Sequence, residues 1–150
     1  MVGGSPNGAG PRPLSSREPT PPMIDNTLPD AELRLPADSA YFAVLRTATA
    51  GLAARINFTL DDIEDLRIAV DEACAILLPQ SRPASELQCR FWLGQATMTV
   101  AVSATCDDPR PPAEQGFAWR VLSALTTFAT SEVEKDRLVL TLSRSAGRHP

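Results

Sequence analysis

The sequence predicts an α+β domain, a two-layer sandwich in which a mixed, mainly antiparallel sheet carries three helices on one face. Two observations lead to this fold class. Some segments alternate apolar and polar residues, as strands with one solvated face do, and others repeat apolar residues at helical spacing. Along the 150 residues, these segments follow the order strand, helix, helix, strand, strand, helix, strand.

The first 30 residues are predicted to form a disordered extension outside the domain. They contain seven of the fourteen prolines and four of the eight glycines, and few side chains that could build a core. The folded domain is therefore expected to span residues 31–146.

The domain is expected to begin with a short strand, Ala31–Pro36, in which Leu33 and Leu35 alternate with charged residues. Asp38 or Ser39 can cap the helix that follows. The apolar stripe of this helix recurs at Tyr41, Leu45, Ala48, Leu52 and Ile56.

A second helix is predicted from Thr59 to Pro79. Thr59 and Asp62 form a capping box at its start, and the proline ends it. One stripe must face a core: Ile63, Leu66, Val70, Ala73, Cys74 and Leu77. Glu72 lies on the flank beside this stripe, so its carboxylate borders the core and can face a cleft, where shifted pKa values and chemistry tend to occur.

A β-hairpin and a final helix-strand pair complete the predicted domain. Strands at 86–93 and 96–103 are joined by a turn at Gly94 and Gln95, and an irregular loop follows to residue 115. The third helix is expected to begin directly after Gly116. The last strand is expected at 137–144. The apolar stripe of the third helix is predicted to run through Phe117, Val121, Leu125 and Phe128.

Composition excludes several classes of function. A net charge of -4 without a lysine or arginine run argues against direct nucleic-acid binding. Cys74, Cys89 and Cys106 are odd in number and widely spaced, which favours buried thiols over disulfides or a zinc site. The only histidine, His149, leaves no histidine-based triad or metal site. No apolar leader or stretch of roughly 18 apolar residues occurs, so we expect a cytoplasmic protein without a membrane segment.

The order of elements and the run LRIAVDEACAILL, residues 66–78, resemble one branch of the gyrase, chaperone, histidine-kinase and MutL (GHKL) ATPase superfamily. This branch contains anti-sigma factors and serine-protein kinases, and the resemblance covers about residues 31–144. It implies a histidine-kinase-like ATPase fold, in which a Glu-Ala-x-x-Asn signature supplies a general base and an asparagine that holds the magnesium of ATP. Glu72 and Ala73 match, but Ile76 stands at the asparagine position and cannot coordinate a cation.

The glycine motifs that this branch uses for nucleotide binding are degraded. Asp107 is the acid nearest to the aspartate that reads adenine, and Gly116 looks like the remnant of the glycine segment that opens the third helix. Outside the first 30 residues the only glycines are Gly51, Gly94, Gly116 and Gly147, so a phosphate loop is excluded. Glu72, Asp107 and Gly116 are thus weak nucleotide-site candidates. No cofactor or metal is expected, although helix N-termini leave ATP and magnesium binding open.

The resemblance therefore implies an anti-sigma factor that sequesters an alternative sigma factor, of the stress or sporulation type. Release by an anti-anti-sigma (STAS-type) partner is expected, and a homodimer stays open. Arg46 aligns with an arginine that such proteins use to contact partners. Trp119 lies off the predicted stripe and either contacts a partner or covers the degraded pocket. Two alternatives remain: an active ATP-dependent serine kinase of the anti-anti-sigma factor, with Glu72 as its base, and a binding module that merely shares the layer order.

Overall fold

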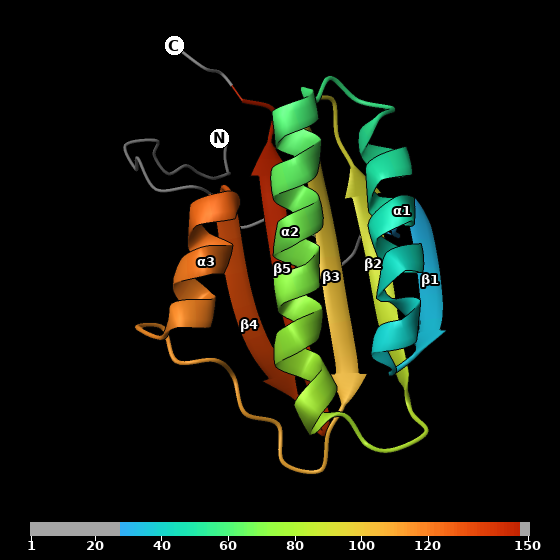
Figure 1. Ribbon diagram of the computed structural model, residues 1–150, viewed down its shortest axis with the longest axis vertical. Coiled ribbons are helices and arrows are strands. Elements are labelled where there is room, and N and C mark those ends of the chain that lie inside the picture. Colours follow the sequence, from blue (N-terminus) through green and yellow to red (C-terminus); the bar gives the residue numbers. More distant parts are fainter. Residues whose placement is uncertain (1–27, 148–150) are drawn as a thin grey trace, which may run out of the picture.

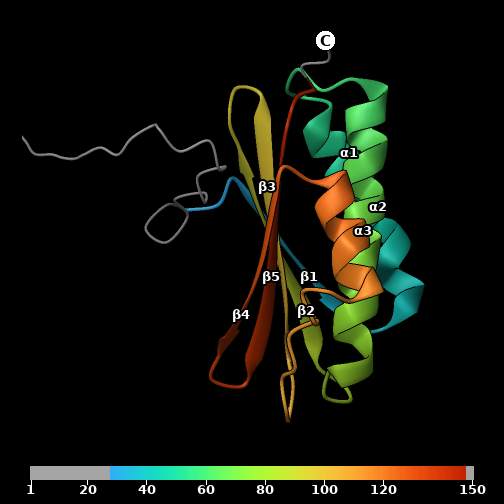
Figure 2. The same cartoon turned by 90° about the vertical axis from the view of Figure 1, so that its left-hand side faces the viewer.

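The computed structural model describes residues 28–147. Residues 1–27 of the predicted extension, and His149, lie outside the described part. Three helices cover one face of a five-stranded sheet, as Figures 1 and 2 show. The elements are β1 (Ala31–Pro36), α1 (Phe42–Ala53), α2 (Leu60–Leu77), β2 (Glu86–Leu93), β3 (Thr97–Thr105), α3 (Phe117–Leu125), β4 (Phe128–Glu134) and β5 (Arg137–Ser145). The α+β class is confirmed.

The strand order is β1-β2-β3-β5-β4, and every pair in the described sheet is antiparallel. The register places Cys89 opposite Val102, and Val102 opposite Leu140. All three side chains are fully buried beneath the helices. Because side chains alternate across a strand, their neighbours Gln88 and Ser103 lie on the face without helices. This face therefore carries the polar positions of the sheet.

The strand β4 was not predicted from the sequence, because the apolar spacing placed Phe128 on the third helix. The helix ends at Leu125, and Thr126 has extended backbone angles, with φ -128° and ψ 161°. Phe128 then pairs with Ser143 across β5. Two adjacent β-branched threonines disfavour a helix at this point, and the gain from pairing with β5 outweighs the helical spacing.

The apolar stripe of α2 is confirmed, since Leu66, Val70, Ala73, Cys74 and Leu77 are all fully buried. The stripe predicted for α3 is wrong in its rotation. Phe117 is 75% exposed, whereas Leu122 is fully buried. The predicted stripe ran from Phe117 to Phe128, and Phe128 lies beyond the end of the nine-residue helix, so the helical spacing was followed over a segment that is only partly helical.

Candidate functional site

Glu72 lies on α2, the central helix of the layer in Figure 1. Its side chain is half-buried and has no hydrogen bond or ion pair within the described residues. Ile76, one turn further on, is half-buried and packs against the hydrophobic core. Glu72 therefore has a hydrocarbon side chain, not an oxygen ligand, one turn further along the helix, and residues 28–147 contain no group of three or more possible metal ligands of the His, Cys, Asp or Glu type.

Arg46 joins α1 to α2 through an ion pair with Asp71, the residue before Glu72. Its Nη1 atom lies 3.0 and 3.1 Å from the two carboxylate oxygens of Asp71. The Arg46 side chain is 33% exposed and that of Asp71 is 37% exposed. A pair at this exposure contributes little to stability, typically about 0.2–1 kcal/mol, so the guanidinium can exchange partners.

Asp107 lies in the loop between β3 and α3, and its contact is with Arg82. The Arg82 Nε atom donates to Asp107 Oδ1 at 2.7 Å, and the Asp107 side chain is 80% exposed. This loop is attached to the end of α2 through Gln80. The Gln80 amide donates to Arg110 O at 3.0 Å and accepts from Arg110 N at 2.8 Å. The loop thus has a defined position below α2 in Figure 1.

Gly116 is the N-cap residue of α3, with an ordinary φ of -77°. Its N–H donates to Ala113 O at 2.9 Å, and a Cβ atom added at Gly116 would lie 3.2 Å from the same oxygen. Glycine is favoured there by this close approach and not by a positive φ. No side chain caps the helix, so its first N–H groups remain available to an anion.

Trp119 is half-buried and packs against the hydrophobic core, three residues before the fully buried Leu122. The exposed aromatic side chain of α3 is Phe117 instead. Phe117 was expected from the sequence to start the buried stripe, which is wrong, whereas Trp119 was left open between a partner contact and a cover for the degraded pocket.

A buried ionic cluster at the start of α2 was also missed. Asp62 is fully buried, and its Oδ1 atom lies 2.8 Å from Nη2 of Arg144, whose side chain is 15% exposed. Burial alone would raise the pKa of Asp62, but hydrogen bonds from the Gly147 N–H, from Arg144 and from Thr59 together hold this pKa well below its usual range. The available signal was Arg144, a charge placed at the end of an otherwise alternating strand.

The three cysteines are buried free thiols, as predicted. Burial raises the pKa of the Cys89 thiol to about 12, and it also raises the pKa values of Cys74 and Cys106. Thiolate chemistry is therefore unfavourable at these positions.

No family model matches this chain. Part of the chain is similar to curated proteins called serine-protein kinase RsbW. The Bacillus velezensis protein is 49% identical over 75 residues, which make up 48% of this chain and 47% of that protein. The Bacillus thuringiensis protein is 49% identical over 74 residues, with 48% and 46% covered.

The chain thus spans about half the length of the curated relatives it matches. This similarity supports the anti-sigma factor and serine-protein-kinase branch that the sequence resembles. Within the described residues, no helix has the length and apolar character needed to cross a membrane.

Proposed function

We propose that this chain is an anti-sigma factor that binds and sequesters an alternative sigma factor of the stress or sporulation type. An anti-anti-sigma (STAS-type) protein releases the sigma factor, and the protein works in the cytoplasm by contact, without a required cofactor. The similarity to serine-protein kinases called RsbW supports this branch. The single observation that carries the choice of binding over catalysis is the packing of Ile76.

Ile76 occupies the position where the related signature has a metal-holding asparagine. Its side chain packs against the core, and the Gln80 amide donates to its backbone oxygen at 3.2 Å. A hydrocarbon side chain cannot coordinate magnesium, which requires oxygen ligands. Phosphoryl transfer depends on metal electrostatics and positioning, so Glu72 by itself is a poor basis for kinase activity.

The outward side of α1 and α2 is the surface that we assign to the sigma factor. It combines the half-exposed Arg46–Asp71 pair with an exposed apolar side chain, Ile68, which lies one turn before Asp71 on α2 and is 39% exposed. Protein interfaces often join an arginine to apolar contacts in this way. A carboxylate on the partner can compete with Asp71 for the guanidinium fork of Arg46.

The test captures partners of the full chain from a native lysate of stressed cells and identifies them by mass spectrometry. An alternative sigma factor should be recovered with the wild type. Arg46→Ala should reduce its recovery about tenfold. Arg55→Ala is the matched control, because Arg55 is exposed and outside this surface. Failure to recover any sigma factor under several stresses would contradict the proposal, and equal recovery with Arg46→Ala would contradict the assigned surface.

An active serine-protein kinase is the second candidate, favoured by the name of the relatives and by the half-buried Glu72, which has no partner among residues 28–147. Radiolabelled ATP, magnesium and the anti-anti-sigma protein are mixed with the chain. Our proposal expects no transfer above background. Transfer that is lost in Glu72→Ala but kept in Glu64→Ala, an exposed glutamate two turns earlier, would establish the kinase instead.

Residual nucleotide binding and dimerisation are tested on the same sample. Calorimetric titration with ATP and magnesium should show no micromolar binding, equivalent to roughly -8 kcal/mol, and such binding would favour the kinase. Sedimentation equilibrium measures the molar mass of the chain in solution, and this mass distinguishes a monomer from a homodimer.

A further inference from the structure

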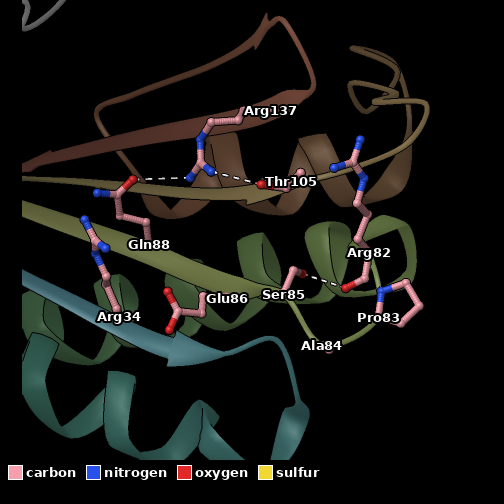
Figure 3. A pocket seen from close by; sticks show the side chains of 9 residues that line it. All are labelled: Arg34, Arg82, Pro83, Ala84, Ser85, Glu86, Gln88, Thr105 and Arg137. Atoms are coloured by element: carbon pink, nitrogen blue, oxygen red, sulfur yellow. Dashed lines mark hydrogen bonds between the residues drawn. The ribbon is translucent and has the colours of Figure 1, made fainter.

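The face of the sheet without helices has a polar cavity of about 530 Å³, shown in Figure 3. We call it the arginine hollow, and the residues that define it here are Arg34, Arg82, Glu86, Gln88, Thr105 and Arg137. Its volume is in the range of small-molecule sites. It lies across the sheet from α2, so it is separate from Glu72 and does not depend on the proposed function.

The strand register brings two guanidinium groups together around Gln88. Arg34 lies directly opposite Gln88, and Gln88 lies directly opposite Ser103. Arg137 Nη2 donates to Gln88 Oε1 at 3.3 Å and to Ser103 Oγ, and its Nη1 donates to Thr105 Oγ1 at 3.1 Å. Figure 3 shows Arg34 and Arg137 on the two sides of the Gln88 side chain.

Neither of these arginines is neutralised by a carboxylate within the described residues. Arg137 donates to three neutral oxygens, and Arg34 makes no side-chain hydrogen bond or ion pair within the described residues. Arg82 differs, because Asp107 at 2.7 Å and Asp136 at 3.4 Å balance its charge. Glu134 lies directly opposite Arg137 in the strand register and Glu86 lines the hollow, but neither carboxylate forms an ion pair with Arg34 or Arg137 within the described residues. Both guanidinium groups therefore remain able to bind an anion in the hollow.

The wall of the hollow is held in place by backbone hydrogen bonds. Arg82 N donates to Thr105 O at 2.9 Å, and Ala37 N donates to Ser85 O at 2.9 Å. Arg137 is likewise oriented by its three neutral acceptors. A ligand would thus meet donors that are already positioned, which reduces the entropic cost of binding.

We propose that the arginine hollow binds a small oxyanion with two negative charges, namely a phosphate group, either free or carried by a phosphomonoester. Two planar guanidinium forks match the oxygens of such a group. The net charge of the chain is -4, so attraction must come from these local arginines and not from the overall field. Glu86 lines the same hollow and opposes binding.

The experiment is an NMR titration of the full chain at constant ionic strength, first with inorganic phosphate and then with β-glycerophosphate. Saturable shifts are expected at the amides of Ser85, Gln88 and Thr105. Arg34→Gln should weaken binding about tenfold, and Glu86→Gln should tighten it several-fold. Arg55→Gln, which removes the same charge outside the hollow, should change the affinity by less than about twofold.

Arg34→Gln is the decisive variant because it breaks no side-chain hydrogen bond in the described part of the chain, whereas Arg137→Gln would remove three. Shifts that do not saturate, or equal weakening by Arg34→Gln and Arg55→Gln, would overturn the proposal. Shifts confined to α3 near Gly116 would overturn it too, because they would locate the anion at that helix N-terminus. Tighter binding of β-glycerophosphate supports a phosphomonoester ligand, and equal binding of the two probes supports free phosphate.

Discussion

Asp62 in the first turn of α2 forms a buried ion pair with Arg144 near the end of β5, at 2.8 Å. Arg144 also contacts Asp65 Oδ2 at 3.1 Å and donates to Leu125 O at 2.7 Å. The Gly147 N–H donates to both oxygens of the Asp62 carboxylate. This cluster joins the start of α2, the end of α3 and the end of the sheet, so it fixes how the helices lie on β5.

Removing the Asp62 carboxylate should destabilise the fold strongly. Asp62→Ala leaves the half-buried Arg144 with only the more exposed Asp65 and one carbonyl, and we expect a loss of about 3 kcal/mol in the free energy of unfolding. Urea denaturation measures this loss. Asp61→Ala, at the exposed neighbouring position, is the control and should cost only a few tenths of a kcal/mol. Equal losses would show that the ion pair is not the cause.

The stabilisation from Asp62 should depend on pH only in acid. Its pKa in the folded state lies below the unfolded value of about 3.9, so the unfolded chain takes up the proton first as the pH falls. The advantage of the wild type over Asp62→Asn should therefore be constant above about pH 5 and should shrink progressively below pH 4. Urea denaturation curves of both proteins across this pH range measure the stability difference. A decrease of this difference between pH 6 and 8 would contradict the lowered pKa of Asp62.

The rotation of α3 can be tested by comparing two truncations to alanine. Leu122→Ala should cost about 3 kcal/mol, because Leu122 is fully buried. Phe117→Ala should change stability by less than about 0.5 kcal/mol, because Phe117 is 75% exposed. Thermal or urea denaturation of both variants measures the two losses in stability and so shows which side of α3 is buried. The opposite ranking would restore the stripe that the spacing predicted.

Replacing Lys135 with glycine should stabilise the turn between β4 and β5. Lys135 has a φ of 60°, in the left-handed region that disfavours side chains with a Cβ atom. We expect Lys135→Gly to gain about 0.5 to 1 kcal/mol after the entropic cost of glycine is counted. Lys135→Ala keeps the Cβ atom and should gain nothing. Similar effects of the two substitutions on urea midpoints would point to the lysine charge instead.

Local patterns predicted most of the elements, and the errors fall where long-range contacts decide. The capping box of Thr59 and Asp62 marked the start of α2, and both of its hydrogen bonds are present. In β4, by contrast, the side chains that face the helices include Ser131, and the strand lies at the edge of the sheet. Its sequence therefore lacks the strong alternation that reveals a half-buried strand.

The same contrast between local pattern and long-range contact holds for the candidate site. The sequence identified Glu72, Ile76 and Arg46 as the residues to examine on the helix layer, and the structure adds the Asp71 partner of Arg46. The arginine hollow could not be predicted from the sequence. It requires that residues of β1, β2, β3 and β5 share a register, and single-strand patterns contain no information about which strands pair.

The sequence by itself determined the α+β class, the capped central helix and the hairpin of β2 and β3. These features depend on residues a few positions apart, whose propensities and periodicities act locally. Only the tertiary structure decided the position of β4, the rotation of α3, the pairing of Asp62 with Arg144 and the placement of Arg34 and Arg137 in one hollow. Those depend on strand register and on burial across elements far apart in the chain, where the free energy of contact outweighs local preference.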